Sequence, residues 1–60
     1  MKNKVKHYRE LAGLTQEELS GKADVSRNTI SSLETGSNTN VTYDTMIKIA
    51  RALNEKVATI

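Results

Sequence analysis

Hydrogen-bonding side chains without carboxylates follow one side of the segment 27–35, RNTISSLET. At 100° per residue, Ile30 and Leu33 share one side of a helix, and Asn28, Ser32 and Thr35 lie opposite them. An exposed helix surface usually carries Glu and Lys, which favour helix more than Asn, Ser and Thr do. Amides and hydroxyls of this kind, with an Arg beside them, can read the edges of DNA bases. A small polar surface helix explains the pattern equally well.

Residues suited to catalysis or metal binding are sparse. The chain has one histidine, His7, and no cysteine, so neither a nucleophile triad nor a thiolate metal site is expected. Glu17 and Glu18 are adjacent, and neighbouring side chains on a helix point in different directions. There is no glycine-rich phosphate loop. We therefore expect no enzyme, no metal site and no cofactor.

Three capping signals indicate where helices begin. In each, an apolar residue precedes a threonine or serine cap, and a second apolar residue lies four positions beyond the cap. These sets are Leu14–Thr15–Leu19, Val25–Ser26–Ile30 and Val41–Thr42–Met46. Glu18 completes a capping box with Thr15, and Gly13 and Gly36 suit helix ends. We expect helices at about 3–12, 16–22, 27–35 and 43–53 in a single domain spanning 1–60.

The inward side of the last helix and the following tail are less clearly marked. Helical spacing predicts an inward stripe made of Tyr43, Met46, Ile47, Ala50 and Leu53. The tail 55–60 is compatible with an extended segment, a strand paired between two copies, or the start of a fifth helix. Its partial alternation and β-branched residues favour the extended form.

Charge and hydropathy limit the partners. The 60 residues carry a net charge of +2, with Lys2, Lys4, Lys6, His7 and Arg9 in the first ten positions. This cluster suits a polyanion, although a solvated basic helix end is an equally common explanation. No apolar run is long enough for a membrane span or a secretory signal, so we expect a cytoplasmic protein.

The run GLTQEELSGKADVSRNTISSLETG closely resembles the helix-turn-helix of lambda-repressor-like (Cro-type) regulators. Arg9 upstream and Lys48-Ile49-Ala50-x-Ala52-Leu53 downstream match as well, so the resemblance covers about residues 3–54. It departs from the family where Asp24 replaces a frequent glycine of the turn. The resemblance implies a compact all-α domain of four to five helices that binds double-stranded operator DNA as a dimer.

Residue roles follow from position in the resembling motif. The implied base-contacting residues are Gln16, Arg27, Asn28 and Ser32. The implied contacts to the DNA backbone are Thr15, Ser26, Thr29, Thr35, Asn38 and Asn40. Arg9 and Glu34 occupy the positions of a largely buried ion pair, and the alternative for Arg9 is a phosphate contact.

The function implied is sequence-specific DNA binding by a transcriptional repressor, on a palindromic operator. A different class of function is a protein-interaction module, such as an antitoxin-like partner that uses residues 56–60 and also binds its own operator. Binding of the basic first helix to a membrane has little support, because its apolar side is narrow and lacks Trp and Phe.

Overall fold

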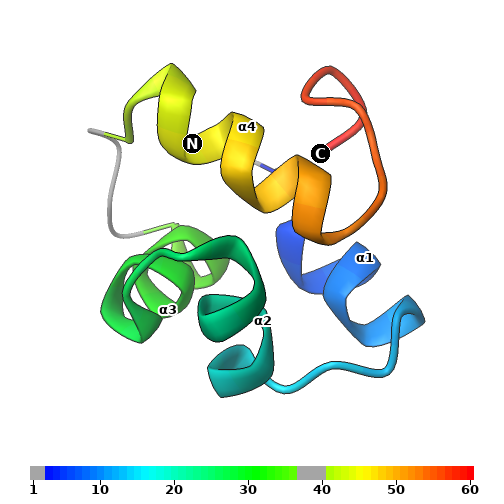
Figure 1. Cartoon of the computed structure of the whole chain (residues 1–60), viewed down its shortest axis with the longest axis vertical. Helices are drawn as coiled ribbons and strands as arrows, with labels where there is room; N and C mark the ends of the chain where they lie inside the picture. Colours follow the sequence, from blue (N-terminus) through cyan, green and yellow to red (C-terminus); the bar gives the residue numbers. More distant parts are fainter. Residues whose placement is uncertain (1–2, 37–40) are drawn as a thin grey trace.

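The computed structural model describes residues 3–36 and 41–60, and in these ranges it contains four α-helices and no strand. They are α1 (Val5–Leu11), α2 (Gln16–Ala23), α3 (Arg27–Thr35) and α4 (Tyr43–Ala52) (Figure 1). The predicted all-α class is confirmed. α3 has its predicted bounds. α2 and α4 differ from theirs by one residue at the end, and α1 is shorter by two residues at its beginning and one at its end. Asn38 and Asn40 lie outside the described residues. None of the described helices has the length and apolar character needed to cross a membrane.

The three predicted caps hold the first turns of α2, α3 and α4. The Thr15 hydroxyl accepts the Glu18 N–H at 3.0 Å, and the Glu18 carboxylate accepts the Thr15 N–H at 2.8 Å, which closes the capping box. Ser26 accepts the N–H of Thr29, and Thr42 accepts the N–H of Thr45, both at 3.1 Å. These bonds satisfy donors that have no partner within the helix and so define where each helix begins.

The turn between α2 and α3 depends on Asp24. This residue adopts the left-handed conformation, with φ of 58° and ψ of 42°, and its N–H donates to the carbonyl of Ser20. The Val25 N–H donates to the same carbonyl at 3.1 Å. Both bonds close the end of α2 and redirect the chain within two residues, so α3 leaves the turn in a fixed direction.

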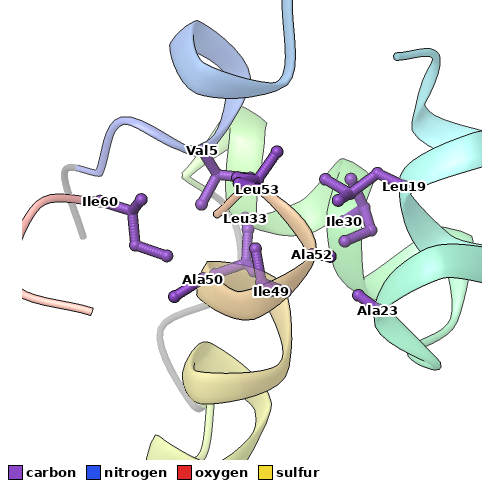
Figure 2. Packing of buried hydrophobic residues seen from close by; sticks show 10 residues of the cluster. All are labelled: Val5, Leu19, Ala23, Ile30, Leu33, Ile49, Ala50, Ala52, Leu53 and Ile60. Atoms are coloured by element: carbon purple, nitrogen blue, oxygen red, sulfur yellow. The ribbon is translucent and has the colours of Figure 1, made fainter. Parts of the chain in front are cut away.

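The core draws on all four helices and the C-terminal segment. Figure 2 shows Leu19 and Ala23 of α2 at one end of the cluster and Ile60 at the other. The fully buried large side chains are Val5, Leu19, Ile30, Leu33 and Ile49. The predicted inward position of Tyr43 is wrong, because its side chain is 70% exposed. Other members of the predicted stripe are confirmed, since Ala50 and Leu53 are buried and Met46 packs against the core. α4 also buries Ile49 and Ala52.

The C-terminal segment folds back as a turn, so the extended form favoured for 55–60 is wrong. Asn54 has a φ of 58°, which reverses the chain at the end of α4. The Thr59 N–H then donates to the Lys56 carbonyl at 2.9 Å. Ile60 reaches the core with 8% of its surface exposed, and its carbonyl accepts the Lys4 N–H at 2.6 Å. Burial of Ile60 offsets part of the entropy lost in ordering this segment.

Candidate nucleic-acid interface

α3 has one buried side and one polar side that faces solvent. Ile30 is fully buried and Leu33 is 1% exposed, whereas Arg27 and Asn28 are exposed and Ser32 is partly exposed. Within the described residues, Arg27 and Asn28 make no side-chain hydrogen bond or ion pair. Their donors and acceptors are therefore available to an external partner.

Two hydroxyl groups lie together at the beginning of α3. The Ser26 and Thr29 hydroxyl oxygens are 2.8 Å apart, so one hydroxyl donates to the other. Ser26 also accepts the Thr29 N–H, as part of the helix cap. The pair uses one hydroxyl hydrogen internally and leaves the second for an acceptor such as a phosphate oxygen. Thr35, at the other end of α3, is exposed and donates to the Ser32 carbonyl at 3.2 Å.

A cluster of hydrogen bonds centred on Glu34 joins α1, α2 and α3. Arg9 donates to both carboxylate oxygens of Glu34, from Nε at 2.7 Å and from Nη2 at 3.2 Å. The Gln16 amide donates to Glu34 Oε1 at 3.0 Å, and Arg9 Nη1 donates to the Leu14 carbonyl at 2.7 Å. The Arg9 and Glu34 side chains are 12% and 4% exposed, so this is the largely buried ion pair.

Electrostatics keep this pair charged. Burial is the largest single influence on Glu34 and by itself raises the pKa of its carboxyl. The hydrogen bonds from Arg9 and Gln16, together with the charges of Arg9 and Lys6, outweigh burial and bring the Glu34 pKa below its ordinary value. The hydrogen bond to Glu34 raises the pKa of Arg9. The negative charge of Glu34, the only carboxylate of α3, is therefore compensated by Arg9. The outward side of the helix presents no unpaired negative charge to an anion.

The beginning of α2 is less open to phosphate than the sequence suggests. Thr15 uses its N–H and its hydroxyl oxygen in the capping box, and the exposed carboxylates of Glu17 and Glu18 lie in the first turn. Gln16 keeps one amide hydrogen and its carbonyl oxygen beyond its bond to Glu34. Nothing in the hydrophobic periodicity links positions 16 and 34, so this bond could not be predicted from the sequence.

The basic cluster of the N-terminal region is smaller than its sequence implies. Lys4, Lys6 and His7 are exposed, whereas Arg9 turns inward to Glu34. Lys2 lies outside the described residues. Arg9 therefore serves the ion pair, and its guanidinium is not presented as a phosphate contact.

Comparison with known proteins identifies the family. The family model described as Helix-turn-helix matches residues 5–60. An uncharacterized HTH-type transcriptional regulator of Methanocaldococcus jannaschii is 50% identical over 50 residues, which cover 83% of this chain and 68% of that relative. No solved structure gives a significant match. The capped α2, the tight turn at Asp24 and the exposed polar side of α3 are the parts that such a motif requires. The chain belongs to the helix-turn-helix family.

Proposed function

We propose that this protein binds double-stranded DNA sequence-specifically by placing α3 in the major groove. The observation that carries the proposal is the division of α3 into a buried apolar side and an exposed side, where Arg27 and Asn28 have no side-chain partner in the described part of the chain. An α-helix fits the width of the major groove, where every base pair presents a distinct pattern of donors and acceptors. The pairing of Glu34 with Arg9 supports the same function, because an unpaired carboxylate there would repel phosphates.

Each polar residue of this surface has a proposed role. Asn28 suits adenine, which offers a donor and an acceptor to one amide, and Arg27 suits guanine. Ser32 and Gln16 are proposed as further base contacts near the centre of the groove. Phosphate contacts are proposed for Thr15, Ser26, Thr29 and Thr35, and, from the sequence alone, for Asn38 and Asn40.

Regulation of transcription is the proposed use of this binding. The relative from Methanocaldococcus jannaschii is named a transcriptional regulator, which supports a regulatory role here. A protein seated on an operator blocks access to the DNA, so we propose repression. One α3 contacts only a few base pairs, and two copies one helical turn apart would read a palindromic site. The proposed binding species on DNA is therefore a homodimer.

Selection from a random duplex library tests the proposal. The protein should enrich a short motif with adenine or guanine at the contacted positions. The centres of the two half-sites should lie about 10–10.5 base pairs apart. Binding should weaken as salt rises, because bound phosphates release counterions. Recovery of unrelated sequences after several rounds, with no consensus, would contradict sequence-specific binding.

A protein partner is the alternative function. Its predicted interface was the tail 56–60, but Ile60 is only 8% exposed and contributes to the core. That burial favours DNA binding by α3 over partner binding by the tail. Copurification of a stoichiometric protein, without salt-sensitive retention on DNA, would support the alternative.

A further inference from the structure

Asn3 connects the beginning of α1 to the end of α3 through one side-chain amide. Its Oδ1 accepts the Val5 N–H at 3.0 Å, and its Nδ2 donates to the Leu33 carbonyl at 3.0 Å. We propose that Asn3 is a positioning residue that fixes the last turn of α3 and thereby the orientation of its reading surface on DNA. The inference rests on the proposed DNA binding and adds a residue that does not touch the DNA.

The amide satisfies the Val5 N–H at the beginning of α1 and gives the Leu33 carbonyl at the end of α3 a second bond. The first N–H groups and the last carbonyls of a helix have no partner inside that helix. Leu33 lies in the last turn of α3, where its carbonyl accepts the Gly36 N–H at 3.2 Å and the Asn3 amide as its second bond. Exchange of the nitrogen and oxygen of Asn3 would break both of its bonds, so the orientation of the amide is determined.

The two ends of α3 are held by different parts of the chain. The turn at Asp24 fixes its beginning against α2. Its end is held by Asn3, which precedes α1 and binds Leu33, and by Arg9 of α1, which binds Glu34. The N-terminal segment that carries Asn3 is itself held, because the neighbouring Lys4 N–H donates to the carbonyl of Ile60. The backbone beside Asn3 is therefore held in place independently of α3.

Beside the buried Leu33 side chain, the end of α3 borders an open space. An open hollow of about 650 Å³ lies between the N-terminal segment, the end of α3 and the C-terminal turn, and Asn3 and Thr35 are among its lining residues. Because this side of the helix end borders an open hollow, the Asn3 amide is the group that links it to the N-terminal segment there.

Two substitutions of Asn3 separate a positioning role from simple capping of α1. Asn3→Asp keeps the acceptor for the Val5 N–H, since Asp caps helices about as well as Asn does. It removes the donor to Leu33 and places a carboxylate beside the negative end of the α3 dipole. Asn3→Ala removes both bonds. If Asn3 only caps α1, Asn3→Asp behaves like the wild type; if it positions α3, both variants are affected.

The DNA measurement is the ratio of affinities for the selected operator and for an unrelated duplex of equal length. We expect the ratio to fall about fivefold to tenfold in both variants, as the loss of one hydrogen bond allows. Val57→Ala is the matched control, because Val57 packs on the core from the C-terminal turn and should affect stability alone. A wild-type ratio in Asn3→Asp, or an equal fall in Val57→Ala, would overturn the proposal.

A second measurement needs no DNA. Amide hydrogen exchange in the last turn of α3, including Gly36, should become several-fold faster in both Asn3 variants relative to the amides of α2. Unchanged exchange there would overturn the positioning role. If the wild-type chain selects no operator, the proposed function fails, and this exchange measurement still decides whether Asn3 holds α3.

Discussion

Glu34 is the residue at which three helices meet. Its carboxylate binds Arg9 of α1 through two hydrogen bonds and Gln16 of α2 through a third, while it belongs to α3 itself. The Arg9 and Glu34 side chains are 12% and 4% exposed, so either of them would be a poorly solvated charge if the other were removed. The ion pair therefore serves to hold α3 at one orientation, and it also removes a negative charge from the surface proposed to meet DNA.

Glu34→Gln should lower the free energy of unfolding by about 1–3 kcal/mol at pH 7, because it weakens charge-assisted hydrogen bonds. Urea denaturation measures this loss. Glu17→Gln, at an exposed carboxylate of α2, is the control and should change stability by less than about 0.5 kcal/mol. Equal losses in the two variants would contradict the role of Glu34.

The same pair predicts the direction of a pH effect. The pKa of Glu34 is lower in the folded protein than its ordinary value of 4.5, so the unfolded chain binds more protons in acid. The stabilisation by Glu34 is present above pH 4.5 and is lost as the pH falls through the lower folded pKa. The difference in unfolding free energy between wild type and Glu34→Gln should therefore shrink below about pH 4.5. A difference that stays constant down to pH 2.5 would contradict the assignment.

The exposed residues of α3 give a prediction about recognition. Asn28→Ala should cost about 1–3 kcal/mol of discrimination at one adenine position of the selected operator, since a bidentate contact is lost. Arg27→Ala should do the same at a guanine. Competition binding with single-base operator variants measures both. If Arg27→Ala weakens all duplexes equally and lowers the salt dependence by about one counterion, Arg27 contacts a phosphate instead.

At the scale of helices, the beginnings of α2, α3 and α4 could be predicted because caps depend on residues close in sequence. Thr15, Ser26 and Thr42 each bond to a residue three positions on, and such signals need no tertiary context. The buried side of α4 could be predicted only in part, because apolar residues surround this helix: Ala50 and Leu53 are buried as expected. Tyr43 lies at the beginning of the helix and is exposed, whereas Ile49, on a helix that contacts α2, is fully buried.

The turn between α2 and α3 gives a prediction about backbone strain. Asp24→Gly should raise the melting temperature modestly, because glycine adopts a φ of 58° without the steric cost that the aspartate side chain incurs. Asp24→Val should lower stability by about 1–3 kcal/mol, since a β-branched residue is strongly disfavoured in that conformation. Thermal unfolding measures both. Equal stability of the two variants would contradict the importance of this conformation.

At the scale of the whole molecule, a 60-residue chain forms only a small hydrophobic core, and the C-terminal turn contributes Ile60 to it. The sequence left the state of 55–60 open because its few residues carry no cap or complete period. Long-range contacts decide it: Ile60 packs on the core and its carbonyl binds the backbone of Lys4. Similarly, the bond between Gln16 and Glu34 depends on the assembled fold.

Truncation of Ile60, the buried side chain of this turn, should destabilise the fold. Ile60→Ala should lower the free energy of unfolding by about 2 kcal/mol, which is typical of a peripheral apolar side chain that loses its packing. Ala58→Ser, at an exposed position of the same turn, is the control and should have little effect. Chemical denaturation of both variants provides the measurement. A neutral Ile60→Ala variant would show that the turn does not contribute to the core in solution.

Insertion of α3 into the major groove is tested most directly with the selected operator carrying 7-deaza purines, one position at a time. This replacement removes the N7 acceptor from the major groove and leaves the minor groove unchanged. We predict that one 7-deaza-adenine weakens binding of the wild type about tenfold and leaves binding of Asn28→Ala unchanged. Full affinity for every 7-deaza duplex would contradict reading of the major groove by α3.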